Sequence, residues 1–182
     1  HVSQHGSLVS PTRLRFDFNH FDSITKEHLL TIEQIVNKEI NASHQVITHV
    51  LPIEEAKKLP GVQAVFGEKY GDVVRVVDME FSKEFCGGTH VENTSNIKKF
   101  AVLSVESKGS GIFRLEGLTG DNIYQTMYEY LTPMKEELTT ISKKVKEIIQ
   151  DAKNKNLQIK EQLVAIPQII GSYKDILNYK DA

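Results

Sequence analysis

The hydrophobic pattern changes along this chain, and this change constrains the fold more than any other feature. Up to about Pro133, apolar residues alternate with polar ones in short runs. In RLRFDF, for example, Leu14, Phe16 and Phe18 fall on one face, as in a half-buried strand. Similar runs are QVITHVL, DVVRVVDM, KKFAVLSVES and GIFRLEGL. The first part of the chain is therefore predicted to be rich in β-strands.

Two helices are predicted among these strands. One covers residues 24–40, with Ser23 or Thr25 as its N-cap. Its apolar positions keep helical spacing, and they are Leu29, Ile32, Val36 and Ile40. A shorter helix is expected after Pro52, through IEEAKKL to the Pro60-Gly61 pair. Because strands and helices do not alternate as regular βαβ units, the sequence favours an α+β fold, with a mixed or antiparallel sheet and packed helices.

Residues from about 121 to the end are predicted to be helical. Apolar residues there recur at spacings of three and four, and this coiled-coil-like seam consists of Leu138, Ile141, Val145, Ile148 and Ala152. Two heptads are marginal alone, so a helical hairpin or a truncated helical arm is expected, and self-association through it stays open. The predicted organisation is one domain over residues 1–120 and a helical tail over residues 121–182.

Charge and cysteine content narrow the functional classes. The 182 residues carry a net charge of −2 and a pI near 6.4, which argues against indiscriminate binding to nucleic-acid phosphates. A single cysteine cannot form an internal disulfide, and no apolar run approaches the roughly 20 residues needed to span a bilayer. We therefore expect a cytoplasmic protein. Because the chain begins at His1 within a strand-like pattern, we also expect it to be part of a longer protein.

The only cysteine stands in EFCGGTHVENTS, residues 84–95. Cys86 and His90 enclose two glycines, Gly87 and Gly88, which allow a ligand to approach the backbone closely. A thiolate and an imidazole suit zinc, but zinc takes four ligands, or three and a substrate, so further ligands must come from elsewhere. The alternative is structural, with Cys86 as a small buried apolar residue and His90 as a core histidine.

A second histidine pair, His1 and His5, has the spacing HxxxH, which brings two imidazoles together only on a helix. Gly6, the β-branched Val9 and Pro11 favour an extended chain here. In a strand the two histidines would stand about 13 Å apart. This pair is therefore not expected to share one metal ion.

Four blocks of the sequence together resemble the editing region of bacterial alanyl-tRNA synthetases. In order and spacing, the matching blocks are HVSQHGSLVSPTRLRFDFNHF, FGEKYGDVVRVVDM, FCGGTHVENTS and GIFRLEGLTG. The resemblance covers about residues 1–120. The tail is similar only in kind, to the helical arm that links the editing region to the C-terminal domain in that family. The aminoacylation domain, which uses ATP and magnesium, has no counterpart in this sequence.

This resemblance implies a zinc site formed by Cys86, His90 and an HxxxH pair on a helix upstream of the block that begins HVSQ. His1 matches a different family histidine, and His5 falls at a variable position. The family hydrolyses tRNA(Ala) wrongly charged with serine or glycine. The resemblance therefore implies an editing module whose parent enzyme ligates alanine to tRNA(Ala) with ATP.

The same resemblance suggests roles for other residues. Gln4 matches a family glutamine and is the candidate catalytic residue that positions substrate or water, the alternative being an ordinary surface amide. The candidate substrate-binding residues are Gly87, Gly88 and Thr89, and Arg114 is the candidate for contact with the tRNA end. Lys98 and Lys99 are further tRNA-binding candidates because they lie close to Arg114 in sequence, the alternative being a solvated charged face. Family members commonly have two adjacent arginines where this chain has Phe113-Arg114. The histidines without a partner at ligand spacing, interpreted as surface or core residues, are His20, His28, His44 and His49.

Two other functions stay open at this point. The chain could be a free-standing editing deacylase of similar sequence. It could also be a non-catalytic tRNA-binding or structural module, since the sequence supplies only half of the implied zinc ligands.

Overall fold

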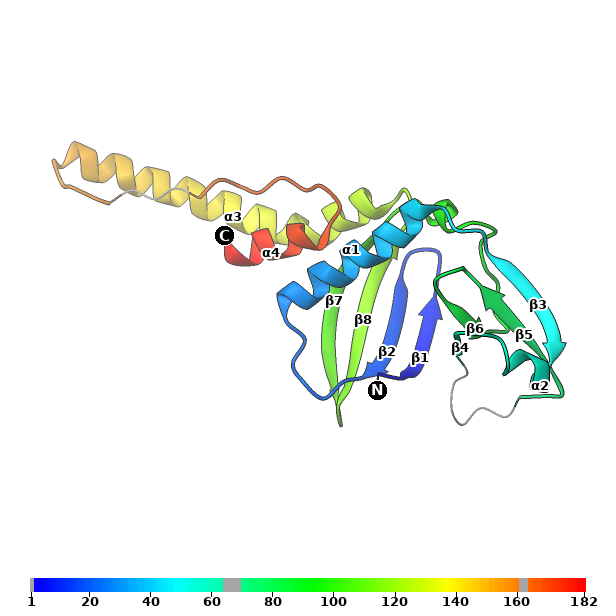
Figure 1. The fold of residues 1–182 in the computed structure, drawn as a ribbon. Helices are drawn as coiled ribbons and strands as arrows, with labels where there is room; N and C mark the ends of the chain where they lie inside the picture. The colour runs from blue at the N-terminus through cyan, green and yellow to red at the C-terminus, as the bar shows by residue number, and fades with distance from the viewer. Residues whose placement is uncertain (1, 64–69, 161–163) are drawn as a thin grey trace. The chain divides into compact units, whose positions relative to one another are not determined.

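The computed structural model describes residues 2–63, 70–160 and 164–182. The chain divides into two compact units, His1–Asp121 and Asn122–Ala182. The first holds two four-stranded sheets and the helix α1 (Lys26–Ala42), and the second holds the helices α3 (Ile123–Asn154) and α4 (Tyr173–Asp181), as Figure 1 shows. The predicted α+β class is confirmed, with two sheets instead of one.

The first sheet is antiparallel, in the order β1-β2-β8-β7. Its strands are β1 (Gln4–Val9), β2 (Leu14–Asn19), β7 (Phe100–Gly109) and β8 (Ile112–Thr119). They coincide with the alternating runs of the sequence. Because β7 lies at the edge of this sheet, the outer backbone groups of β7 need partners from outside the sheet.

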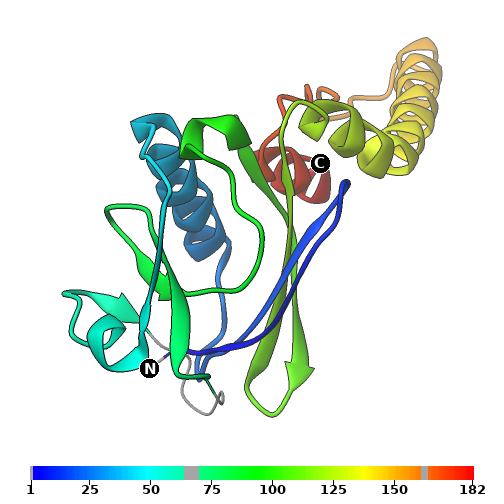
Figure 2. The same cartoon turned by 90° about the vertical axis from the view of Figure 1, so that its right-hand side faces the viewer.

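Helix α1 supplies these partners to β7, along which it packs (Figure 2). The amide of Asn37 donates to the carbonyl of Phe100 at 2.7 Å and accepts from its N–H at 2.9 Å. Two residues on, the N–H of Val102 donates to the carboxylate of Glu33 at 2.8 Å. Glu33 is buried. Two polar side chains of the helix therefore occupy the edge of β7 in the way that a further strand would.

The ends of α1 agree with the prediction to within two residues. Thr25 caps the helix, since its hydroxyl accepts from the N–H of His28 while the ring of His28 accepts from the N–H of Thr25. The helix ends where Ser43 adopts a left-handed conformation, with φ of 61°.

The second sheet is mixed, in the order β3-β5-β6-β4, with β4 parallel to β6. Its strands are β3 (Ile47–Pro52), β4 (Val62–Gln63), β5 (Val73–Asp78) and β6 (Lys83–Phe85). One face carries a small core in which Val74 and Val76 pack with Phe85 and with Ala56 of α2 (Ile53–Ala56). Alternation along β5 places Arg75 on the opposite face.

Helix α2 is shorter than predicted. After Ala56 the backbone bonds join residues three apart, from Lys58 to Glu55 and from Leu59 to Ala56, so the chain tightens into turns before Pro60.

The second unit corrects the prediction of a helix to the end of the chain. α3 runs through Pro133 but ends at Asn154, and the described residues 155–160 and 164–172 are not helical. Asn156 turns the chain with φ of 55°, and Pro167 and Gly171 follow. The buried carboxylate of Asp175 then accepts from three successive backbone N–H groups, those of Ile170, Gly171 and Ser172, which fixes the start of α4.

The predicted seam on α3 is only partly buried. Ile141 and Ile148 are exposed, whereas Ala152 is buried. The hydroxyl of Tyr179 on α4 donates to the carbonyl of Pro167 at 2.8 Å, so the returning segment and α4 form a folded end to the unit. In the described part of the chain, no helix combines the length and the apolar character that crossing a lipid bilayer requires.

Replacing Asn37 with Ala is expected to lower the free energy of unfolding by about 1–3 kcal/mol, because the N–H and carbonyl of Phe100 then lose their partner. Urea unfolding followed by circular dichroism measures this change. The exposed Asn41 on the same helix provides the control, and Asn41→Ala should stay within about 0.5 kcal/mol of the wild type. Equal effects of the two substitutions would contradict the role of Asn37.

Candidate functional site

The candidate site is the loop of residues 86–93, between β6 and the short 3-10 helix η1 (Thr94–Ile97). The register of β5 with β6, in which Val76 faces Phe85, places Cys86 opposite Arg75. The N–H of Cys86 donates to the carbonyl of Arg75 at 3.1 Å and extends the pairing by one residue. The loop therefore begins at a fixed point of the second sheet.

The other end of the loop is held by the C-terminal end of α1. The buried hydroxyl of Thr94 donates to the carbonyl of Glu39 and accepts from the N–H of His44, both at 2.9 Å. Asn93 caps η1 through Ser95 and also donates to the carbonyl of Ser43. The second half of the motif EFCGGTHVENTS thus has a structural role, and residues 86–90 are left for binding.

Cys86 and His90 both lie near Gly88. Cys86 is half-buried and His90 is exposed. A Cβ atom placed on Gly88 would lie 3.7 Å from Sγ of Cys86 and 4.0 Å from Cε1 of His90. A thiol and an imidazole are groups that zinc prefers, so the chemistry of the two side chains fits one part of a zinc ligand set. Their role as ligands stays a prediction.

Within residues 2–63, 70–160 and 164–182, no three side chains of histidine, cysteine, aspartate or glutamate are grouped so that they could hold a metal ion. His5 lies in β1, in the extended conformation that the sequence predicted. His1 lies outside the described residues.

Arg75 contacts the loop but was not singled out by the sequence. Its guanidinium donates through Nη1 to the carbonyl of Gly88 and through Nη2 to the hydroxyl of Thr48 on β3 at 3.4 Å. Only the alternation of DVVRVVDM, which sets Arg75 opposite to the buried Val74 and Val76, could have indicated it.

The structure places Gln4 in β1 of the first sheet, while Cys86 follows β6 of the second. The Gln4 side chain is exposed, and its amide donates to the hydroxyl of Ser7 at 3.2 Å. Thr89 and Gly87 are exposed on the loop. The roles predicted for these residues stay predictions.

Arg114 forms a bidentate ion pair with Asp17, with Nε–Oδ1 and Nη2–Oδ2 distances of 2.8 and 2.7 Å. The hydrogen bonds to Arg114 lower the pKa of Asp17, and the pair raises that of Arg114. Beside it, the ring of Phe113 stacks on that of Phe18, with centroids 6.3 Å apart. The position at which the family commonly has a second arginine therefore belongs to an aromatic cluster here.

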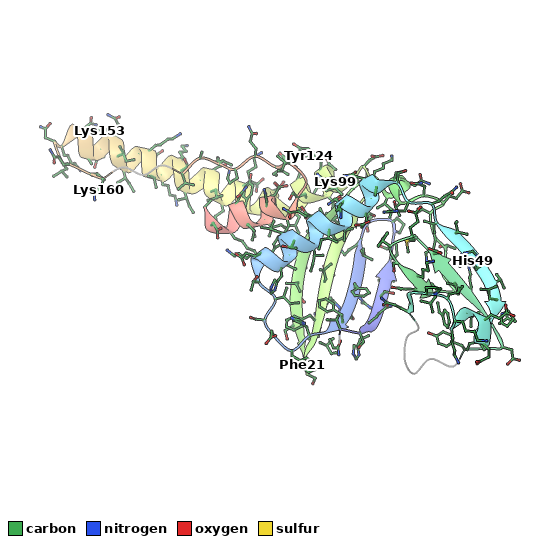
Figure 3. The ribbon with its side chains drawn as sticks, viewed as in Figure 1. Phe21, His49, Lys99, Tyr124, Lys153 and Lys160 are labelled. Carbon is green, nitrogen blue, oxygen red and sulfur yellow. The ribbon has the colours of Figure 1, made fainter. Side chains whose placement is uncertain are left out.

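The two lysines predicted to contact tRNA lie just before β7. Lys98 forms an ion pair with Asp121. Lys99 is exposed, and Figure 3 labels it at the start of β7.

His44 is a second residue that the sequence did not reveal. Nδ1 lies 3.0 Å from a carboxylate oxygen of Glu80, and Nε2 lies 2.9 Å from one of Glu39. These hydrogen bonds, first that of Glu80 and then that of Glu39, raise the pKa of His44 above its ordinary value. His44 thus joins the end of α1 to the connection between β5 and β6. Glu39 is 5 residues from His44 in sequence and Glu80 is 36 residues from it, and neither separation is a spacing that predicts a contact.

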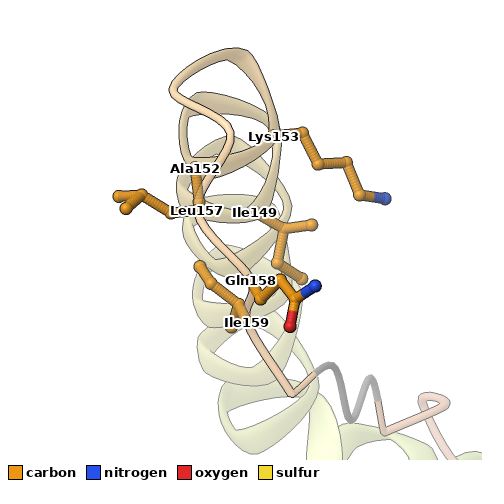
Figure 4. Close-up of a pocket in the computed structure, with 6 residues that line it drawn as sticks. All are labelled: Ile149, Ala152, Lys153, Leu157, Gln158 and Ile159. Atoms are coloured by element: carbon orange, nitrogen blue, oxygen red, sulfur yellow. The ribbon is translucent and has the colours of Figure 1, made fainter.

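A pocket of about 290 Å³ lies within the second unit, at the end of α3 (Figure 4). Its lining residues are Ile149, Ala152, Lys153, Leu157, Gln158 and Ile159. They include neither a carboxylate nor a histidine or cysteine, so this pocket offers no acid–base pair and no ligand of the kind that zinc prefers.

Comparison with known proteins shows similarity to aminoacyl-tRNA synthetases. Residues 74–116 match the model of the threonyl and alanyl tRNA synthetase second additional domain. The chain is 46% identical over 181 residues to the alanine–tRNA ligase of Acholeplasma laidlawii (strain PG-8A), covering 99% of the chain and 20% of that protein. It is 46% identical over 149 residues to that of Bacillus subtilis (strain 168), covering 81% and 17%. It is 45% identical over 169 residues to that of Hydrogenovibrio crunogenus, covering 88% and 19%. The chain thus spans about a fifth of the length of these relatives.

His44→Gln is expected to remove a pH-dependent part of the stability. Because the folded-state pKa of His44 lies above its ordinary value of 6.5, its contribution is complete below that value and is lost as the pH rises through the folded-state pKa. The free energy of urea unfolding of the wild type should therefore fall as the pH rises above about 6.5, and it should fall less in the variant. His49→Gln, at an exposed position of β3, should keep the wild-type slope. The same slope in all three proteins would refute the role of His44.

Proposed function

Because this chain belongs to the alanyl-tRNA synthetase family, in which it represents the editing region, we propose that it hydrolyses seryl-tRNA(Ala) and glycyl-tRNA(Ala). The parent protein would ligate alanine to tRNA(Ala) with ATP and magnesium in the cytoplasm. The observation that carries the proposal is the loop of residues 86–90. It carries a thiol and an imidazole that both lie near Gly88, and it is held at Cys86 by Arg75 and beyond His90 by Thr94.

The need for such a module follows from the limits of binding selectivity. A pocket for alanine cannot readily reject glycine, which is smaller, and it excludes serine only weakly, because serine adds a single hydroxyl. A second site that hydrolyses the wrong product can correct these errors. A hydrolytic site close to a metal-binding loop meets this need.

Cys86 and His90 would hold a zinc ion together with two ligands from outside the described residues. When bound, zinc supplies a positive charge that polarises or orients the aminoacyl ester. The backbone of Gly87 and Gly88 and the side chain of Thr89 would line the space beside the ligands. Gln4 would position the substrate or a water molecule through its amide.

The tRNA would contact the first unit through Lys98, Lys99 and Arg114. Lys98 and Arg114 already form ion pairs with carboxylates, so a phosphate would have to compete with Asp121 and Asp17. We therefore expect these residues to contribute modestly to affinity, and the contribution to weaken at higher salt.

A non-catalytic tRNA-binding module is the second candidate. It is favoured by the finding that only two suitable ligands lie together in the described part of the chain. A free-standing deacylase is less well supported, because in the relatives named above this sequence occupies about a fifth of a longer synthetase.

The test compares this chain with a version extended upstream by about 30 residues, to include a helix with HxxxH, and assays zinc content and deacylation of seryl-tRNA(Ala). The extended version should bind zinc and deacylate. Cys86→Ser and His90→Gln should each lower the deacylation rate at least about 100-fold, since even the partners of ligands contribute 10- to 100-fold. His49→Gln provides the matched control and should leave the rate unchanged.

Three outcomes separate the candidates. Loss of both zinc and activity in the two ligand variants supports the editing site. Full activity of Cys86→Ser without zinc would overturn the metal assignment and leave Gln4 and the glycine turn as candidates. Binding of tRNA(Ala) by the extended version without hydrolysis would favour the non-catalytic module.

A further inference from the structure

We propose that Arg75 is a positioning residue that holds the glycine turn of the loop, so that Cys86 and His90 can bind one metal ion. This inference rests on the proposed function for the identity of the ligands. The contacts of Arg75 itself are independent of it.

The register of the second sheet brings Arg75 to the loop. β5 and β6 are neighbouring strands (Figure 1). They pair with Val76 opposite Phe85 and Val77 opposite Glu84, so Arg75 and Cys86 are neighbours across the two strands. Cross-strand neighbours share one face of a sheet. Because Val74 and Val76 face the core that contains Ala56, Arg75 and Cys86 face away from it.

Arg75 restrains the loop at two points. Its carbonyl accepts from the N–H of Cys86 at 3.1 Å, and its guanidinium donates to the carbonyl of Gly88. The second arm of the guanidinium reaches Thr48 on β3 at 3.4 Å, which ties the side chain to the neighbouring strand. The backbone between Cys86 and Gly88 is thus held by one half-buried residue, through its backbone carbonyl at Cys86 and through its side chain at Gly88.

The glycines explain why such a restraint is needed. Among the described residues, a Cβ atom on Gly87 would meet nothing within 4 Å, and one on Gly88 would meet only Cys86 and His90. Glycine also has the largest backbone freedom of any residue. In the part of the chain that the structure describes, only the two candidate ligands therefore lie close to the positions where side chains of the turn would begin. The hydrogen bond from Arg75 therefore supplies an order that side-chain packing does not.

Lysine should not replace Arg75. A guanidinium is planar and carries several N–H donors in a fixed fork, so it can reach Gly88 and Thr48 together. An ammonium group is a single point on a flexible stem. Arg75→Lys keeps the charge but loses this geometry, and Arg75→Gln loses both.

The first measurement is hydrogen exchange of backbone amides in the whole chain, without metal. In Arg75→Gln, the amide of Cys86, which donates to the carbonyl of Arg75 at 3.1 Å, should exchange at least about tenfold faster, because the charged hydrogen bond to the carbonyl of Gly88 no longer holds the turn. Arg75→Lys should show a smaller increase at the same amide. The amides of β5 and β6 should exchange as in the wild type. An equal increase in β5 and β6 would indicate that Arg75 only stabilises the sheet, and would overturn the proposal.

The second measurement is the zinc affinity of the upstream-extended version, by competition with a chelator. Arg75→Gln should weaken zinc binding about 10- to 100-fold, in the range found for residues that orient ligands. Arg13→Lys provides the control, since Arg13 forms an exposed ion pair with Glu116 on the first sheet. Unchanged zinc affinity in Arg75→Gln would overturn the proposal.

These measurements separate the inference from the proposed function. Faster exchange of the loop and weaker zinc binding in a protein that does not deacylate would retain Arg75 as a positioning residue and refute the editing activity. Deacylation that requires Cys86 and His90 but is unaffected by Arg75→Gln, with unchanged exchange in the loop, would support the editing activity and refute the role of Arg75. If Arg75→Gln does not fold, the exchange of the Cys86 amide in Arg75→Lys decides.

Discussion

The buried hydroxyl of Thr94 is the contact on which the arrangement of the first unit depends. It donates to the last turn of α1 at Glu39 and accepts from the N–H of His44, so one side chain joins the motif to the helix. The same helix covers the edge of β7 through Asn37 and Glu33. A polar atom buried at such a junction has a fixed position because leaving it without a partner is costly. The end of α1 thus relates the edge of the first sheet to the loop that leaves the second.

Much of the fold could be predicted because it follows from periodicity. Alternation in RLRFDF and GIFRLEGL placed β2 and β8, and spacing with a threonine cap placed α1. The prediction that the tail is helical to its end was wrong because a helical pattern does not show where a helix ends. The chain leaves α3 where Asn156 adopts a left-handed conformation. It enters α4 where the carboxylate of Asp175 accepts from the backbone N–H groups before that helix. Both features depend on local geometry.

The sequence could point to the candidate loop but not to its supports. Cysteine and histidine four residues apart, with two glycines between them, predict a ligand pair from the residue types alone, and this stays a prediction. Arg75 lies 13 residues from Gly88 in sequence and meets it only because β5 and β6 pair in one particular register. His44 likewise meets Glu80 only after the second sheet has formed. Contacts of this kind depend on tertiary structure, so a spacing argument cannot find them.

The proposed metal site would be divided between separate segments, and it would bind more tightly if each segment were ordered before the ion arrives. If residues 86–90 moved freely, binding would have to fix their backbone as well as the side chains of the ligands, and each residue so fixed opposes binding by about 1–2 kcal/mol. The loop satisfies this requirement from outside itself, through Arg75 at its beginning and Thr94 at its end. The two glycines can then leave room beside the ligands without leaving the loop disordered. For this reason we regard the supports of the loop, as much as its cysteine and histidine, as the part of the sequence that specifies the site.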